Sequence, residues 1–277
     1  MSALLTSEEI RKIEEFIAVE LGCNINLLQT SRIEIVGSKA RIIVSNGRIC
    51  PLKTIKTPHG CVISVQPKMS NETKQEVGNL TPLQIFSELG INRIRTLMKH
   101  FGSNTIHGPY VHLYCNRKLF NSKDTREVIR LLPNNNPLLK KWFSRSEYNH
   151  SFFGKQKIMM LFGIVVHDKL VSVCGVRRNS KDIYEVGVDT LEEYKGKGLA
   201  KKVVSAATQE ILNVGRIPHY ETKLENVSSL RVAKALGYVE YNQEISCIKR
   251  ENKMRFLWHY FNTQLKPLSY YFEKPYF

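Results

Sequence analysis

Residues 185–200 read EVGVDTLEEYKGKGLA, and this stretch decides the fold. Residues 183–190 are mostly apolar or β-branched and predict a strand. A loop with two glycines follows, and from Leu199 onward apolar residues recur every three or four positions, which predicts a helix that ends near Gly215. The stretch therefore predicts a strand that leads through a tight loop into the N-terminus of a helix.

The loop has the properties of an anion-binding site. The first N–H groups of a helix lack partners within the helix, and the positive end of the helix dipole lies beside them. Gly196 and Gly198 carry no Cβ atom that would block a diphosphate. The lysines that strengthen the local field are Lys195, Lys197, Lys201 and Lys202. The spacing matches neither a Walker loop nor the G-x-G-x-x-G motif, and a glycine pair alone is more often only a turn.

A second motif follows at residues 226–238, which read NVSSLRVAKALGY. The two motifs together resemble the GNAT superfamily of acetyl-coenzyme A dependent N-acetyltransferases, over roughly residues 154–246. That family has a strand, an R/Q-x-x-G-x-G/A loop and a helix, followed by an N-x-x-[A/S] helix that ends in G-[F/Y]. Here Glu193 to Gly198 match the loop and Asn226 to Tyr238 match the second helix. The resemblance implies an α/β fold with a mixed sheet.

The resemblance also implies how acetyl-coenzyme A would bind. Backbone amides would hold its pyrophosphate, and they belong to Lys195, Gly196, Lys197, Gly198, Leu199 and Ala200. Pantetheine would lie where strand 183–190 splays from strand 219–223, and it would pair with the main chain of Val186 and Val188. Asn226 would contact the pantetheine amides, and Ser229 would lie near the end of the cofactor.

Acetyl transfer to an amine needs a base for the amine, a donor that polarises the thioester carbonyl, and a proton for the departing thiolate. Glu185 is the candidate base, either directly or through a water, with Asp182 as a weaker alternative. Glu185 is equally suited to an ion pair with Arg177, Arg178 or Lys223. Backbone N–H groups near Val188 are expected to polarise the carbonyl.

Two residues depart from the family pattern. Glu193 stands where Gln or Arg is usual, and Ala233 stands where the family often places a tyrosine as general acid. Tyr220 and Tyr241 are the candidates to protonate the thiolate instead. The alternatives are that the thiolate leaves without an acid, or that the site is inactive.

The composition, with 42% hydrophobic residues, is that of a globular protein, and the net charge of +16 calls for a polyanionic partner such as a phosphate-bearing cofactor or nucleic acid. A solvated basic surface explains the charge equally well. The six cysteines are scattered, which favours a reducing, cytoplasmic location. With eight histidines they form no cluster of metal-ligand spacing, so we expect no metal. No apolar run is long enough to cross a bilayer, and no secretory signal is expected.

The rest of the chain predicts three segments. Residues 1–133 form an accessory α/β region that shapes the acceptor site, 134–250 the acetyltransferase domain, and 251–277 an aromatic tail that packs on the domain or a partner. A turn-rich run at 133–137 marks the boundary. The further elements expected are helices at 7–21, 82–90, 91–101 and 122–132, strands at 32–36, 40–45, 48–52, 110–115, 157–167, 170–177 and 239–246, and a hairpin turn at Asn46-Gly47.

The sequence thus predicts an N-acetyltransferase that uses acetyl-coenzyme A and a small-molecule or peptide amine. The main alternative is a non-catalytic binding or sensor protein of the same fold, with nucleic acid as a less favoured ligand. A third is a longer acyl donor, or transfer to a protein or RNA group. A homodimer is compatible with the aromatic tail, and no membrane partner is expected.

Overall fold

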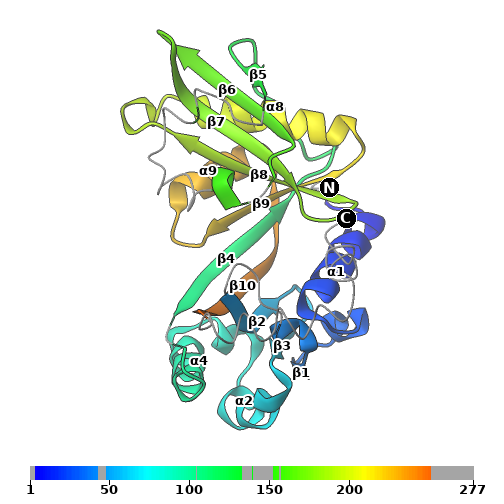
Figure 1. Ribbon diagram of the computed structural model, residues 1–277. Helices are drawn as coiled ribbons and strands as arrows, with labels where there is room; N and C mark the ends of the chain where they lie inside the picture. Colours follow the sequence, from blue (N-terminus) through cyan, green and yellow to red (C-terminus); the bar gives the residue numbers. More distant parts are fainter. Residues whose placement is uncertain are drawn as a thin grey trace, which may run out of the picture. The chain divides into compact units, whose positions relative to one another are not determined.

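The structure is a computed structural model that describes residues 4–42, 48–103, 105–132, 139, 152–155 and 157–250. The described chain divides into two compact units (Figure 1). One contains residues 4–9 and 112–240 and is called the motif unit here; the other contains 10–111 and 241–250 and is called the N-terminal unit. These limits differ from those of the predicted segments 1–133 and 134–250. The roles of these segments stay predictions. The turn-rich run at 133–137 and the tail at 251–277 lie outside the described residues.

The motif unit is built on a mixed sheet, as the sequence predicts. Its strands lie in the order β4, β9, β8, β7, β6 and β5. The bounds are Ile106–Tyr114 for β4, Ile217–Lys223 for β9, Ile183–Thr190 for β8, Lys169–Arg178 for β7, Met160–Val166 for β6 and Ile129–Leu131 for β5. Neighbours from β5 to β8 are antiparallel, whereas β8 and β9 are parallel. This change of direction places the β8–α8–β9 connection at the centre of the sheet.

Helices hold that central connection against the sheet. The helix α8 (Leu199–Asn213) packs on β6, β7 and β8 and contacts α9 (Val227–Ala235) (Figure 1). The buried positions of α8 include Val203, Ala207 and Ile211, which is the spacing that the sequence shows. The short helix α7 (Phe152–Lys155) contacts β8, and η4 (Glu192–Tyr194) lies in the loop before α8. The loop of interest is therefore anchored at both ends by buried elements.

The strands of the N-terminal unit lie in the order β1, β3, β2, β10 and β4. The further strands are β1 (Ile33–Gly37), β2 (Arg48–Lys56), β3 (Cys61–Val65) and β10 (Val239–Arg250). The helices are α1 (Ser7–Leu21), η1 (Ile25–Gln29), η2 (Lys39–Ile42), η3 (Pro67–Met69), α2 (Ser70–Val77), α3 (Pro82–Ile85) and α4 (Glu88–His100). The limits between the two units fall within α1, β4 and β10.

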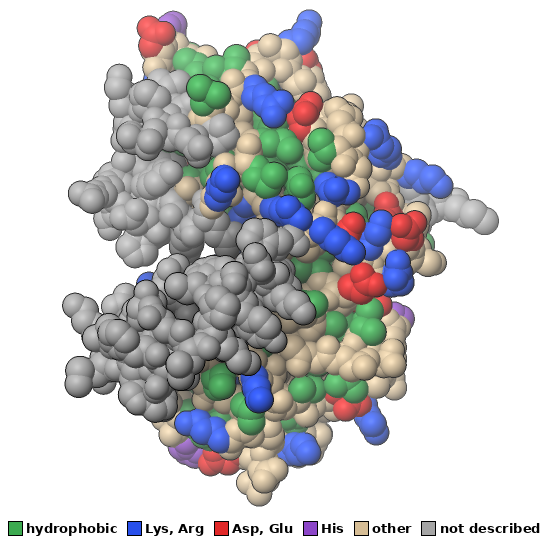
Figure 2. Space-filling view, turned by 45° about the vertical axis from the view of Figure 1, so that its right-hand side comes forward, with side chains coloured by type: hydrophobic (Ala, Val, Ile, Leu, Met, Phe, Trp, Pro, Cys, Tyr) green, Lys and Arg blue, Asp and Glu red, His purple; other side chains and the backbone are tan. Residues whose placement is uncertain are grey.

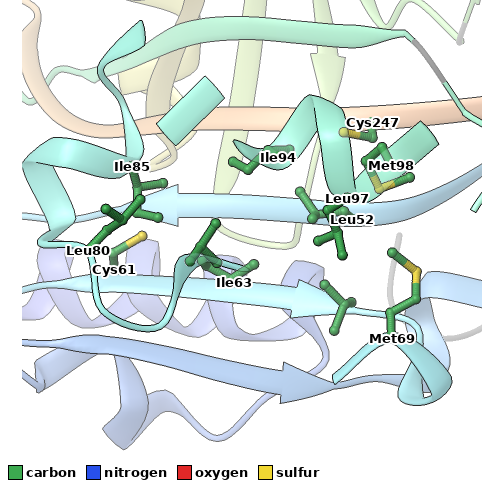
Figure 3. Close-up of a cluster of buried hydrophobic side chains, with 12 residues drawn as sticks. Leu52, Cys61, Ile63, Met69, Leu80, Ile85, Ile94, Leu97, Met98 and Cys247 are labelled. Carbon is green, nitrogen blue, oxygen red and sulfur yellow. The ribbon is translucent and has the colours of Figure 1, made fainter. Parts of the chain in front are cut away.

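An apolar cluster joins strands of this unit to α4. Side chains of Leu52, Ile63 and Cys247 on the strands face Ile94, Leu97 and Met98 on α4 (Figure 3). All six are fully buried. Such a cluster gives the N-terminal unit a core of its own.

Several predicted elements are confirmed. Thr6 and Glu9 exchange hydrogen bonds at the start of α1, with distances of 2.7 Å and 3.2 Å. The hairpin of β6 and β7, the strand β8, the helices α8 and α9 and the strand β10 occur where the sequence predicts them. The Asn46-Gly47 turn lies outside the described residues.

Three predicted elements are wrong. Residues 122–132 form no helix, because the Asp124 carboxylate binds the Arg126 amide in a turn and residues 129–131 pair with β6. The helix at Pro82 ends at Ile85, and Gly90 lies inside α4, where a Cβ atom would come within 2.4 Å of the Ile85 carbonyl oxygen. Residues 39–42 form η2 instead of the start of a strand.

Candidate functional site

The loop before α8 is open on its outer side. Gly196 and Gly198 have φ angles of 78° and 80°, in the left-handed region that disfavours side chains, and Gly198 is the N-cap of α8. A Cβ atom at either glycine would meet nothing within 4 Å. The two glycines therefore turn the chain onto the helix while leaving space beside its first turn.

Five consecutive backbone amides point into the loop without a protein acceptor. In the described part of the chain, the N–H groups from Gly196 through Ala200 make no hydrogen bond. The amide of Lys195 donates to the Glu192 carbonyl at 3.1 Å, and that of Lys201 donates to the Gly198 carbonyl at 3.1 Å. Of the predicted pyrophosphate donors, Lys195 thus has its amide already engaged.

Side chains around the loop are mostly paired at the surface. Lys195 contacts Glu192 at 2.5 Å, and the Lys197 ammonium lies 4.7 Å from the centre of the Tyr194 ring. Glu193, the departure from the family pattern, is bound to Lys169 at 2.8 Å, and this hydrogen bond lowers the pKa of its carboxyl group. Its charge is therefore balanced by Lys169.

The parallel pairing of β8 and β9 stops in mid-strand. The paired residues run from Ile183 with Ile217 to Val186 with Tyr220, although β8 continues to Thr190 and β9 to Lys223. Val186 belongs to the last pair, and Val188 lies beyond it. We call this place, where the pairing ends, the opening.

Asn226 and Ser229 lie on α9, which follows β9. Asn226 caps the helix, and its Oδ1 accepts hydrogen bonds from the Ser229 amide at 3.2 Å and the Ser228 hydroxyl at 2.9 Å. The Ser229 hydroxyl is 2.9 Å from that of Tyr220. The end of the β8–β9 pairing and the start of α9 are thereby connected.

Glu185 is buried and held by an arginine. Two guanidinium nitrogens of Arg177, the residue opposite it on β7, donate to its carboxylate at 2.7–3.0 Å, and Asn179 donates at 2.7 Å. Burial alone would raise the pKa of Glu185, but the charges of Arg177 and His219 and the bond from Asn179 outweigh it and lower the pKa to about 2. The ion pair with Arg177 is thus present, which leaves the carboxylate a weak base.

A protein-family model described as GNAT acetyltransferase matches residues 114–244. We call these residues, which are similar to that family, the GNAT segment. The match covers nearly the same residues as the motif unit, whose main part is 112–240. It includes both motifs, the opening and Glu185.

Solved structures with similarity to the chain include GNAT acetyltransferases. A GNAT acetyltransferase from Colwellia psychrerythraea is 12% identical, with 89% of this chain and 97% of that chain covered and a TM-score of 0.45. A Drosophila protein is 15% identical, with coverage of 90% and 98% and a TM-score of 0.47. A GCN5-related N-acetyltransferase-like protein from Streptococcus suis is 16% identical, with coverage of 74% and 85% and a TM-score of 0.43. The search of curated proteins gives no match.

The two tyrosine candidates of the GNAT segment lie in different units. Tyr220 is buried beside the opening, and burial raises the pKa of its hydroxyl to about 12 despite the bond with Ser229. Tyr241 lies in the N-terminal unit, where its hydroxyl donates to Glu14 at 2.6 Å. Burial and this carboxylate raise the pKa of Tyr241. The structure brings Tyr220 together with Ser229 and Asn226.

The sequence reasoning missed two buried histidines. His219 lies on β9 opposite Glu185, and its Nε2 is 3.0 Å from Nδ1 of His112 on β4. A single histidine in a strand forms no motif, and these two are 107 positions apart in the chain. Only the register of the sheet, which the sequence does not state, brings them together.

Two other features concern partners. Within the residues that the structure describes, no group of three or more His, Cys, Asp or Glu side chains is placed to hold a metal ion. In the same residues, no helix is both long and apolar enough to span a bilayer.

Proposed function

We propose that the GNAT segment transfers an acetyl group from acetyl-coenzyme A to a primary amine. The observation that carries the proposal is the run of free amides from Gly196 through Ala200 next to the opening. Five unpaired N–H groups at the positive end of a helix suit a diphosphate, and strand edges that pair with no neighbour suit the amides of pantetheine.

The proposed donor site uses residues of both motifs. The amides from Gly196 to Ala200 bind the pyrophosphate, with Lys197 and Lys201 adding positive charge. The main chain of Val186 and Val188 pairs with pantetheine along the side of β8 that faces the opening. Asn226, whose Oδ1 is engaged in capping α9, offers its Nδ2 to a pantetheine carbonyl.

The proposed reaction is direct attack. The amine nitrogen forms a bond to the thioester carbonyl carbon, the carbon–sulfur bond breaks, and the amine gives its proton to a water molecule. Backbone N–H groups near Val188 polarise the carbonyl oxygen. The Tyr220 hydroxyl gives its proton to the thiolate and regains one from water, with the Ser229 hydroxyl as relay.

Calorimetry with acetyl-coenzyme A tests the donor site. Gly198→Ala puts a side chain on a left-handed residue among the free amides. Gly215→Ala is a matched control at the other end of α8, because Gly215 has a φ of 68° and equally open surroundings. Both variants carry similar backbone strain, of about 1 kcal/mol. We expect only Gly198→Ala to lose affinity, by about tenfold or more.

Equal affinity in both variants would argue against this site, and no binding to the wild-type protein at millimolar concentration would argue against the function. Release of the coenzyme A thiol across a panel of amines, polyamines, amino acids and peptides then identifies the acceptor. A longer acyl donor is compared in the same assay.

The alternative is a binding protein without turnover. Figure 2 shows Lys and Arg side chains spread over the visible face, with Asp and Glu among them, instead of gathered in one patch. A dispersed charge of this kind gives weak nucleic-acid binding that declines with salt. Salt-dependent retention on nucleic acid without thiol release would favour the alternative.

A further inference from the structure

A hydrogen-bonded chain of polar side chains, in which Glu185, His219 and His112 are buried, crosses four strands of the motif unit. Arg177 on β7 donates to Glu185 on β8. The Nδ2 atom of Asn179, in the β7–β8 turn, is 2.7 Å from Oε2 of Glu185 and 3.2 Å from Nδ1 of His219 on β9. His219 reaches His112 on β4 at 3.0 Å, and the two rings are within 2° of parallel. Both histidines are buried.

The chemistry of these groups fixes which atoms carry protons. A carboxylate only accepts hydrogen bonds, so the Asn179 atom beside Glu185 is its NH₂ group. The second hydrogen of that group points to Nδ1 of His219, which therefore accepts. His219 then carries its proton on Nε2 and donates it to Nδ1 of His112. The carboxylate of Glu185 thus fixes which group donates in each hydrogen bond from Asn179 to His112.

This arrangement requires a neutral His219. A proton on its Nδ1 would face the NH₂ group of Asn179 at 3.2 Å, and the other acceptor within reach is Glu185 Oε2 at 3.7 Å. His219 can keep such a proton only by exchanging Asn179 for Glu185. Protonation of His219 therefore breaks its hydrogen bond with Asn179.

The surroundings oppose that proton. The described charged and titratable groups facing His219 are Glu185 on β8, Arg177 on β7, and His112 and Tyr114 on β4, with the Tyr114 ring stacked at 4.8 Å. Burial lowers the pKa of His219 and Glu185 raises it, while His112 and Arg177 lower it further, so that the pKa is below its ordinary value.

The chain lies at the base of the opening. His219 and Glu185 form the register pair immediately before Val186 and Tyr220, the last pair of β8 and β9. Any shift of His219 relative to Glu185 is therefore passed to the residues where the strands part.

We propose that His219 and His112 are positioning residues that hold β9 in register with β8 at the base of the opening only while the His219 imidazole is neutral. The proposal rests on the proposed function in one respect, namely that acetyl-coenzyme A binds at the opening. Protonation of His219 at acid pH then weakens acetyl-coenzyme A binding, and this change occurs at a pH below the ordinary pKa of histidine.

The test compares wild-type protein with His219→Gln between about pH 7.5 and 5. The glutamine amide still donates toward His112, but it does not titrate. By calorimetry we expect wild-type affinity for acetyl-coenzyme A to fall at acid pH, and the fall in His219→Gln to be lost or moved by about one pH unit or more. His167→Asn is the control, because His167 is exposed in the β6–β7 turn and should leave the wild-type profile unchanged.

Imidazole ¹⁵N NMR of the full chain provides a readout that does not depend on acetyl-coenzyme A. The expected result at neutral pH is a neutral His219 with its proton on Nε2. Identical affinity profiles for wild-type protein and His219→Gln, or a proton on Nδ1 of His219 at neutral pH, would overturn the proposal. If acetyl-coenzyme A binds at no pH, the proposed function fails, and the NMR titration alone decides on the histidines. Should His219→Gln not fold, the NMR titration of the wild-type protein decides the proposal.

Discussion

Glu185 and Arg177 form an ion pair whose side chains are 4% and 17% exposed. Removal of this ion pair should destabilise the fold. Glu185→Gln leaves the guanidinium in a largely buried place without its carboxylate. We expect a loss of roughly 3–5 kcal/mol in the free energy of unfolding at neutral pH, measured by urea denaturation. Glu225→Gln removes an exposed pair with Lys223 and should cost less than about 1 kcal/mol.

The same pair sets a pH dependence with a definite sign. The pKa of Glu185 is about 2 in the folded protein, below its ordinary value of 4.5. A lowered carboxyl pKa stabilises the fold fully above about pH 4.5, and this contribution is lost as the pH falls toward 2. The stability difference between wild-type protein and Glu185→Gln should therefore shrink in that range. A difference that stays constant would mean that the carboxylate is not what Arg177 requires.

At the scale of elements, β8 and α7 meet through a glycine. A Cβ atom on Gly187 would lie 2.2 Å from Cγ of Phe152, whose ring also covers the Arg177 guanidinium at 4.7 Å. Cγ is attached near the backbone of α7, so the ring cannot move aside without moving the helix. We expect Gly187→Ala to destabilise the protein by about 1–3 kcal/mol in thermal or urea unfolding.

Gly175→Ala is the matched control on β7. Its Cβ atom would meet the ring edge of Phe153 at 3.0 Å, which a small ring rotation relieves. The loss of stability in Gly175→Ala should be clearly smaller than in Gly187→Ala. Equal stability of Gly187→Ala and the wild-type protein would show that α7 is not held against β8 as described.

Elements whose shape is set locally could be predicted from the sequence. Gly196, Gly198 and the apolar spacing after Leu199 determine the loop and α8 without help from the rest of the chain. Residues 122–132 show the limit, because a helical pattern there gives way to pairing with β6, a contact between distant segments. The site follows the same rule. The free amides were predictable from the loop, whereas the bond between His112 and His219 depends on strand register.

For the whole molecule, composition could not locate the division into two units. The sequence places a boundary in the polar run at 133–137, whereas the units part between 9 and 10, between 111 and 112 and between 240 and 241. These limits fall within α1, β4 and β10, and the periodic pattern of a helix or strand does not change where the element passes from one core to another. The family match to 114–244 is the observation that agrees with the motif unit.

The division into units makes the two tyrosines distinguishable. Tyr241 falls inside the family match, but its hydroxyl is committed to Glu14 in the N-terminal unit. Tyr241→Phe should lower stability by about 1–3 kcal/mol, because it leaves a buried carboxylate short of a donor, while kcat is retained. Tyr220→Phe should lower kcat by a factor of about 10² or more with little change in acetyl-coenzyme A affinity, because the proton for the thiolate is lost. Thiol release and calorimetry on both variants measure these effects. Retained kcat in Tyr220→Phe would mean that the thiolate leaves unprotonated.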